Sequence, residues 1–483
     1  MSIQLVLLAI SLYFGLLMLI SYLTSRKSGD DTYFTGDRKS PWFLVAFGMV
    51  GSALSGVTFV SLPGSVGNNH LYFAQFVLGN VAGYLFIAFV LTPLYYRLQL
   101  VSIYGYLKER FGNISYKSGA SIFLVSQSFG AALRLMLATK ILQFAFFDRI
   151  GIPFYLTVII IIVFVWLYTF KSGIKTIVWT DSIQTFFLIL SVIIISLGIS
   201  KALDFSFSET ITQISRHRYF DFFNWDVKSG NYFFKQFIAG FFVSVAMIGL
   251  DQNMMQKTLT CKNVWDAQKN TLTYSFVLAI TQILFLCLGI LLYIYAGHIG
   301  IHLSVNDSGM LLHTDNLFPD VALNYLGVVA GISFLLGIIA ASFSSVDSAL
   351  TALTTSFTYD FLDISSKSPK DKKRIKKMAL VGFSFVLFAI IMLFSRSQGD
   401  VISLIFNVAG YTYGPLLGLY IFGMFTKLNV HDKWVWLVCI AAPLITYALS
   451  WYMRNGFGFD FGFVSIAING LLTFMGLLLL QRK

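Results

Sequence analysis

The chain has 483 residues, of which 57% are hydrophobic and only 12% are charged, and its formal net charge is +12. Soluble domains carry about 25% charged residues, so this composition excludes an ordinary cytosolic enzyme. Apolar runs of about 20 residues, the length that crosses a bilayer as a helix, recur along the whole chain. The basic residues fall mostly in short gaps between these runs, which indicates membrane topology rather than nucleic-acid binding. The sequence therefore predicts a multi-pass membrane protein.

The apolar runs predict thirteen transmembrane helices in a single transporter domain, 1–483. In chain order the expected helices are 2–23, 42–69, 72–96, 118–145, 152–170, 174–200, 233–253, 270–297, 326–360, 378–396, 400–425, 434–453 and 462–480. With connections on alternating sides, 24 of the 34 lysines and arginines fall on one side, notably in 254–269 and 361–377. The positive-inside rule then places the N-terminus outside and the C-terminus inside a plasma or inner membrane.

Two of the expected helices contain residues that interrupt a helix. The segment 48–67 holds five glycines and one proline, which should break the span and expose backbone carbonyls. In 239–256 a glycine and an aspartate interrupt an apolar run. Two interrupted spans, each opening a set of five helices, indicate inverted repeats with a binding site between them. We expect an extra helix, 2–23, then repeat one, 42–200, repeat two, 233–425, and two C-terminal helices within 434–480.

Ionisable residues within the expected spans are candidates for function, because a charge at the bilayer centre costs about 2.5–3.5 kcal/mol on insertion scales. These residues are Arg134, Lys140, Asp181, Asp251 and Asp347. Arg134 could bind a substrate carboxylate through its fork of donors, or it could snorkel or pair with a structural acid. The sequence leaves these interpretations open.

A stripe of small and oxygen-bearing residues lies on the helix that contains Asp347. Ala341, Ser344, Ser345 and Ser348 follow the i, i+3, i+4, i+7 spacing of one helix face, and Asp347 lies beside them. Several oxygens of this kind can hold a small hard cation such as sodium. Such a stripe also allows close helix packing, but the carboxylate favours the cation site.

Three glycines spaced four apart lie in GYTYGPLLGLYIFG, at Gly410, Gly414 and Gly418. Close helix packing and the lining of a cavity both remain possible for them. The chain has no H-E-x-x-H, G-x-S-x-G, P-loop or glycine-rich dinucleotide motif. We therefore expect a transporter and not an enzyme.

Four motifs carry a family resemblance: WTDSIQ, LDQNMMQKTLTCK, ASFSSVDSALTALTTSFTYDF and YGPLLGLYIFGMF. Together they resemble the sodium/solute symporter family, which implies a LeuT-type inverted repeat behind an extra N-terminal helix. The resemblance also implies a core sodium site made of carbonyl and hydroxyl oxygens from Gly51, Leu54, Ala341, Ser344 and Ser345. Members with a second sodium use an aspartate and hydroxyls that match Asp181, Ser344 and Ser348. Asp347 departs from the pattern, because it stands where such members usually have Ser or Thr, and we assign it to the second site.

For the substrate, the resemblance implies binding residues at Ser55, Thr58, Gln75 and Asp251. Sialic-acid-type relatives place an arginine at the position of Gly130, and Arg134 lies about one turn beyond it. We expect a sodium-coupled secondary active symporter that imports a small organic anion, a carboxylate or acidic sugar, by alternating access with two sodium ions. A neutral sugar, a polyol or an amino acid is the alternative substrate, and a non-transporting membrane sensor is the alternative class. The expected partners are the solute, sodium ions and the lipid bilayer, without nucleic acid.

Overall fold

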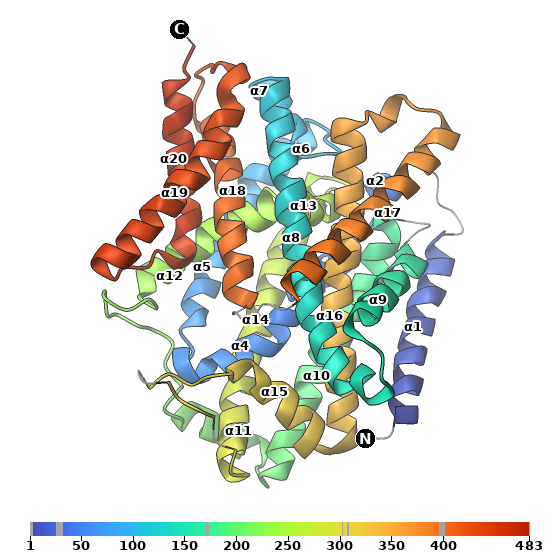
Figure 1. Ribbon diagram of the computed structural model, residues 1–483, viewed down its shortest axis with the longest axis vertical. Coiled ribbons are helices and arrows are strands. Elements are labelled where there is room, and N and C mark those ends of the chain that lie inside the picture. The colour runs from blue at the N-terminus through green and yellow to red at the C-terminus, as the bar shows by residue number, and fades with distance from the viewer. Residues whose placement is uncertain are drawn as a thin grey trace.

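The computed structural model describes residues 3–25, 32–169, 173–301, 303–306, 309–395 and 401–482. The expected helix boundaries at 2, 170, 396 and 400 lie outside these residues. Within the described residues the fold is helical, and extended pairing is limited to isolated bridges. The long helices form an upright bundle, with the two chain ends at opposite ends of its long axis (Figure 1).

Ten of the described helices are long and apolar enough to cross a membrane, and the number rises to twelve if each of two bent pairs counts as one span. The unbent helices are α1 (Ile3–Ser25), α8 (Asn113–Ala145), α10 (Ile174–Ala202), α14 (Val264–His298), α16 (Gly327–Ser356), α17 (Pro369–Phe394), α18 (Val401–Phe425), α19 (Val435–Phe457) and α20 (Ser465–Leu479). One further span joins α5 (Phe73–Phe86), η2 (Ile87–Leu91) and α6 (Thr92–Arg97). The apolar helix α9 (Phe154–Thr169) is shorter.

Short helices occupy the connections. They are α2 (Thr32–Thr35), η1 (Gly36–Arg38), α7 (Gly105–Arg110), η3 (Phe147–Ile150), α11 (Phe207–Arg216), η5 (Thr314–Asn316), α15 (Leu317–Asp320), η6 (Val321–Tyr325), η7 (Phe357–Phe361), η8 (Ile364–Ser366), η9 (Asp432–Trp434) and η10 (Gly462–Val464). Of these, η6 and η7 are π-helical turns, and η7 extends α16 at its C-terminal end.

The two expected breaks are present. In the first, α3 (Trp42–Ala53) and α4 (Gly56–Asn69) meet at 65°. The backbone of Ser55 is extended there, and its hydroxyl caps α4 by accepting the Thr58 N–H. In the second, α12 (Phe233–Ser244) and the π-helical turn η4 (Val245–Gly249) meet α13 (Gln252–Thr258) at 70°. Asp251 is extended and caps α13 by accepting the Met254 N–H.

Three helix starts differ from the sequence expectation because polar caps extend the helices beyond their apolar runs. α8 begins at Asn113 instead of 118, where Asp432 accepts the Ile114 and Ser115 N–H groups at 2.9 and 2.8 Å. α14 begins at Val264 instead of 270, where Asn263 accepts the Asp266 N–H at 2.8 Å. The basic segment expected to be an inside loop, 361–377, is helical from Pro369 onward. Ser368 caps it and Pro369 occupies the first turn, where a missing N–H costs nothing.

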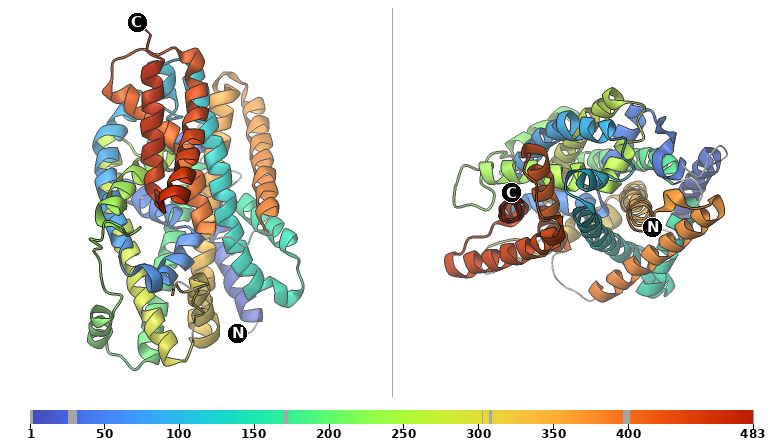
Figure 2. Two further views of the ribbon diagram at one scale, coloured as in Figure 1. Left: turned by 60° about the vertical axis from the view of Figure 1, so that its left-hand side comes forward. Right: turned by 90° about the horizontal axis from the view of Figure 1, so that it is seen from above.

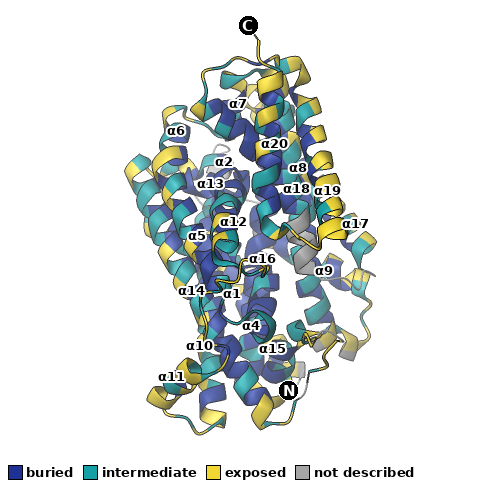
Figure 3. Ribbon diagram, turned by 90° about the vertical axis from the view of Figure 1, so that its left-hand side faces the viewer, coloured by how far each residue is buried: buried dark blue, intermediate teal, exposed yellow. Residues whose placement is uncertain are grey.

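Burial varies strongly between helices. α16 crosses the centre of the bundle, and its residues Ile338–Leu353 are buried without exception. α19 lies at the periphery and exposes large apolar side chains such as Leu444 and Trp451, as suits a lipid-facing helix (Figure 3). The bundle seen from above has α19 and α17 on its outside (Figure 2).

Glycines allow close approach at two helix pairs. Gly79 and Gly240 bring α5 and α12 together, because a Cβ added at either would lie 2.0 or 2.1 Å from a backbone carbonyl oxygen of the other helix. A Cβ added at Gly414 or Gly418 of α18 would lie 2.3 or 2.5 Å from side-chain atoms of Asn469 and Thr473 of α20. Of the two possibilities left open for the glycines of α18, helix packing is therefore the one observed.

Candidate functional site

The carboxylate of Asp181 lies at the centre of a buried polar cluster between four helices. Asp181 comes from α10 and is completely buried. Its Oδ1 accepts a hydrogen bond from the Ser344 hydroxyl of α16 at 2.8 Å. Its Oδ2 accepts from Ser52 of α3 at 3.0 Å and from Ser348 of α16 at 3.2 Å. Both carboxylate oxygens thus accept hydrogen bonds from neighbouring hydroxyls, as the burial of a charge requires.

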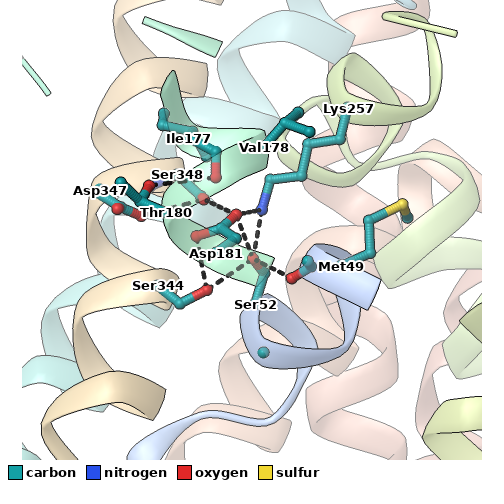
Figure 4. Close-up of polar contacts among 12 residues, drawn as sticks. Met49, Ser52, Ile177, Val178, Thr180, Asp181, Lys257, Ser344, Asp347 and Ser348 are labelled. Atoms are coloured by element: carbon teal, nitrogen blue, oxygen red, sulfur yellow. Dashed lines mark hydrogen bonds and ion pairs between the residues drawn. The ribbon is translucent and has the colours of Figure 1, made fainter. Parts of the chain in front are cut away.

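The fourth neighbour of this carboxylate is a lysine. The Nζ of Lys257, from α13, lies 2.6 Å from Asp181 Oδ2 and also donates to the Ser52 hydroxyl. The side chain of Lys257 is only 1% exposed. Figure 4 shows the lysine reaching the carboxylate from the side opposite Ser344 and Asp347. Removing either charge would leave the other buried without a counter-charge, which is strongly unfavourable.

Lys257 is a correction to the count of basic residues in the expected inside loop, 254–269, which included it. The helix continues beyond the break at Asp251 as far as Thr258, and Lys257 lies inside the bundle. The missed signal is its position, six residues after an aspartate that interrupts an apolar span. Ser52 was also missed, although it follows Gly51 in the glycine-rich segment.

Part of the predicted core sodium site comes together around Ser52. The Ser345 hydroxyl donates to the Ala341 carbonyl at 3.0 Å and lies 3.5 Å from the Ser52 carbonyl. Ser344 lies 3.0 Å from the Ser52 hydroxyl, in addition to its contact with Asp181. The cluster therefore contains neutral oxygens from the first break and from α16, the donor set that suits sodium.

Gly51 and Leu54 flank this contact at the end of α3. The Gly51 N–H donates to the Thr185 hydroxyl at 2.9 Å, and a Cβ at Gly51 would lie 2.4 Å from the same oxygen, so only glycine fits against α10 here. The Leu54 N–H donates to the Val50 carbonyl, and its backbone then leaves the helical conformation.

Asp347 is fully buried on α16, and Ser348 links it to Asp181. Its Oδ1 accepts the Ser348 N–H at 2.5 Å and lies 3.2 Å from the Ser348 hydroxyl, which also reaches Asp181. Figure 4 places the Asp347 carboxylate on the side of Asp181 away from Lys257. The three residues of the predicted second sodium site, Asp181, Asp347 and Ser348, are thus adjacent.

A cavity of about 1430 Å³ adjoins this cluster, and Ser52 lines both. The cavity reaches from the two breaks to residues of the connecting segments, including Asn231, Asp315 and Asp460. Four of the five predicted substrate residues line it: Ser55, Thr58, Arg134 and Asp251. Lys140, one of the ionisable residues within the expected spans, also lines the cavity.

Gln75, the remaining predicted substrate residue, is not among the residues that line the cavity. Its side chain is completely buried and holds a connecting segment instead. The amide Nε2 donates to the carbonyls of Tyr72 and Asn231, at 3.1 and 2.9 Å, and its Oε1 accepts the Asn224 N–H at 3.0 Å. Its hydrogen-bonding groups are thereby used by the protein.

Arg134 projects from α8 onto the cavity and is only partly buried. Within the described part of the chain, no carboxylate lies within 4 Å of its guanidinium, although Asp251 lines the same cavity. Asp251 is instead engaged by the Tyr413 hydroxyl, which donates to its Oδ2, and by the Met254 N–H at 3.1 Å. Arg134 therefore lines the cavity without an ion pair to a described carboxylate.

Uncharged polar groups on the same cavity also lack partners. Five buried atoms have no hydrogen bond to any described residue: Ser61 Oγ, Asn80 Oδ1, Gln127 Nε2, Asn253 Oδ1 and Gln282 Oε1. A buried polar group without a partner costs about 1–3 kcal/mol. Sequence reasoning missed all five, because amides and serines are common in membrane helices and no spacing separated these from others.

The fold and these two sites are those of a membrane transporter built around broken helices, with a buried polar cluster beside a solute-sized cavity. The profile of the sodium:solute symporter family matches residues 33–431, and the chain belongs to that family. It is thus a multi-pass protein of the cell membrane whose coupling ion is sodium.

Named relatives show how far this similarity extends. The chain is 25% identical to the sodium/sialic acid symporter NanT of Aliivibrio fischeri, over 96% of this chain and 92% of that protein. It is 24% identical to the sodium/sialic acid symporter SiaT of Proteus mirabilis, over 86% and 83%. The solved structure of a Na⁺-coupled sialic acid symporter in a substrate-bound, outward-open state superposes with a TM-score of 0.81 at 20% identity, covering 98% of this chain and 97% of that one. This last similarity establishes a shared fold.

Proposed function

We propose that this protein is a sodium-coupled symporter that imports a small organic anion, and that the anion is an acidic sugar. The observation that carries the proposal is Arg134, a cation on the cavity wall with no carboxylate within 4 Å in the described residues. A guanidinium binds a carboxylate through two parallel hydrogen bonds, which fixes the orientation of the ligand as well as its charge. The sialic acid symporters among the relatives support the same class of substrate.

The unpartnered amides favour an acidic sugar over a simple carboxylate. Asn80, Asn253 and Gln282 present acceptor oxygens, and Gln127 presents a donor. Sugar hydroxyls both donate and accept, so a polyhydroxylated anion could satisfy these groups together with Arg134. A short aliphatic carboxylate would leave them unpaired, which lowers the affinity of a site built for hydroxyls.

Binding of the ion and binding of the solute are coupled because Ser52 belongs both to the cation cluster and to the wall of the cavity. We place sodium between the carbonyls of Gly51, Leu54 and Ala341 and the hydroxyls of Ser344 and Ser345. Ser52 lies between that position and the cavity, with its hydroxyl on Asp181 and its carbonyl near Ser345. Ion binding would then fix the end of α3, next to the substrate residues Ser55 and Thr58.

For the topology we propose thirteen spans, N-terminus outside and C-terminus inside, with α9 and both bent pairs each crossing the membrane. The two breaks support an inverted repeat, 42–200 and 233–425, preceded by helix 2–23 and followed by two helices within 434–480. The cavity reaches the segments 203–232 and 303–316, which this topology puts outside. The described conformation then corresponds to an outward-facing state of the alternating-access cycle.

Uptake into proteoliposomes tests the proposal. An inward sodium gradient should drive accumulation of radiolabelled sialic acid, and Arg134→Gln should reduce it about 100-fold while sodium alone still raises the melting temperature. Lys140→Gln is the matched control, since it removes a cation from the same helix and the same cavity. It should retain most of the uptake.

Three outcomes would contradict this assignment. Normal uptake by Arg134→Gln would make that residue structural. Sodium-driven uptake of a neutral sugar, polyol or amino acid, with none of any anion, would refute the substrate class. Sodium and solute binding without transport would indicate a membrane sensor on the same scaffold.

A further inference from the structure

The ammonium of Lys257 lies where a cation bound to Asp181 would lie. Its Nζ is 2.6 Å from Asp181 Oδ2, a direct contact slightly shorter than the about 2.7–2.9 Å usual between a cationic N–H donor and a carboxylate. It also contacts the Ser52 hydroxyl, a second oxygen of the cluster. Both side chains are at most 1% exposed, so neither charge is screened by bulk water.

The surroundings of Asp181 are saturated while the lysine is present. Three hydroxyls and one ammonium donate to its two oxygens. A sodium ion on this carboxylate would need lone pairs from Ser344 and Ser348, whose hydroxyl hydrogens now point at Asp181. It would also lie close to a second positive charge in an interior where like charges repel strongly.

The lysine also connects parts of the transporter that belong to different repeats. It starts from α13, the short half of the second broken helix, and ends on Asp181 of α10 and Ser52 of α3. Ser344, which we assign to the core sodium site, donates to the same carboxylate. A change at Asp181 is therefore transmitted to α13 and to the core site by direct contact.

From these contacts we propose that Lys257 is a tethered competitor of sodium at Asp181, an inference that rests on the proposed function. In the sodium-free protein, the Lys257 ammonium occupies the second cation position. Sodium binds between Asp181, Ser344 and Ser348 only when the ammonium withdraws from Oδ2, and its withdrawal removes the ion pair that ties α13 to α10. Lys257 thus lowers the affinity of the chain for sodium and links ion binding to the second break.

Sodium titration of the purified full-length protein tests this inference. Melting temperature is measured against sodium chloride, with choline chloride keeping the ionic strength constant. Lys257→Met has nearly the same side-chain length without the charge, and we expect its half-saturating sodium concentration to be at least fivefold lower than that of the wild type. Lys175→Met is the matched control, because it removes the exposed ion pair with Asp37 at 3.5 Å and should leave sodium binding unchanged.

A mutant cycle assigns the effect to Asp181. In an Asp181→Asn background the additional Lys257→Met substitution should change the half-saturating concentration less than twofold, because the competition needs the carboxylate. If Lys257→Met is too unstable to purify in choline, sodium should restore its yield. Equal failure in both salts would overturn the inference.

The remaining outcomes distinguish failure of the proposed competition from failure of the proposed sodium-coupled transport. A half-saturating sodium concentration in Lys257→Met that equals or exceeds the wild-type value overturns the competition while leaving sodium-coupled transport intact. A wild-type protein whose melting temperature does not respond to sodium at all overturns the proposed function, and the competition with it.

Discussion

The two broken helices bend by similar angles, 65° and 70°, but differ in the groups that they place at the break. The first break, between α3 and α4, carries uncharged residues, and a serine caps its second half. The second break is capped by Asp251 and places Lys257 near the end of its short second half. The first break therefore carries no charged residue, whereas the second has an acidic residue before α13 and a basic residue near its end.

This difference separates their roles. Carbonyl and hydroxyl oxygens at the neutral break can bind and release a cation without leaving a buried charge behind. The charged residues of the second break require permanent partners from other helices. Tyr413 of α18 donates a hydrogen bond to Asp251, and Asp181 of α10 forms an ion pair with Lys257. We infer that the first break binds the ion and that the second transmits its binding.

The largest effect is expected from removing the partner of the charged break. Asp181→Asn leaves the Lys257 ammonium buried without a counter-charge and should cost about 3–5 kcal/mol of stability. The double variant Asp181→Asn/Lys257→Met removes both charges and should recover most of this loss. Thermal unfolding of the purified variants in detergent measures both. A double variant no more stable than Asp181→Asn would show that loss of the ion pair does not cause the lower stability.

A smaller effect should follow at the other end of α13. Tyr413→Phe removes the hydroxyl that donates to Asp251, and a hydrogen bond to a charged group contributes about 1.5–3 kcal/mol. Tyr84→Phe is the control, because it removes a hydroxyl from a neutral pair with Tyr274 at 3.3 Å beside the same cavity. It should cost about 1 kcal/mol. Equal losses in thermal unfolding would contradict the distinction between a charged and a neutral break.

The smallest change belongs to the neutral break. Ser345→Ala removes one hydroxyl oxygen near the Ser52 carbonyl and should raise the half-saturating sodium concentration threefold to tenfold, about 0.6–1.4 kcal/mol. Ser342→Ala is the matched control on the same helix, since its hydroxyl only donates to the Ile338 carbonyl. Sodium-dependent thermal stabilisation measures both. Unchanged sodium dependence in Ser345→Ala would remove this residue from the core site.

The positions of both breaks could be predicted from the sequence because their causes are local. Glycines, a proline and an aspartate weaken a helix wherever they occur in a span, and the structure breaks at Leu54–Ser55 and at Leu250–Asp251. The stripe of Ala341, Ser344, Ser345 and Ser348 could be read from helical spacing for the same reason. Sequence spacing alone therefore located Ser344 and Ser348, two of the three hydroxyls that contact Asp181.

Lys257 and Gln75 show what local patterns leave out. A lysine after an apolar run is normally a loop residue, and only its partner on α10, 76 residues earlier in the chain, makes its burial possible. Gln75 is polar at the start of a helix near the cavity, but contacts with Asn224 and Asn231 occupy it. In both cases the decisive contact is with a residue far along the chain, which no sequence window contains.

The glycine contact between α5 and α12 has a mechanical consequence for the second break. Each helix fits so closely into the other at Gly79 and Gly240 that sliding along the shared axis would drive side chains into backbone carbonyls. A movement of α12 at the second break would therefore carry the closely packed α5 with it.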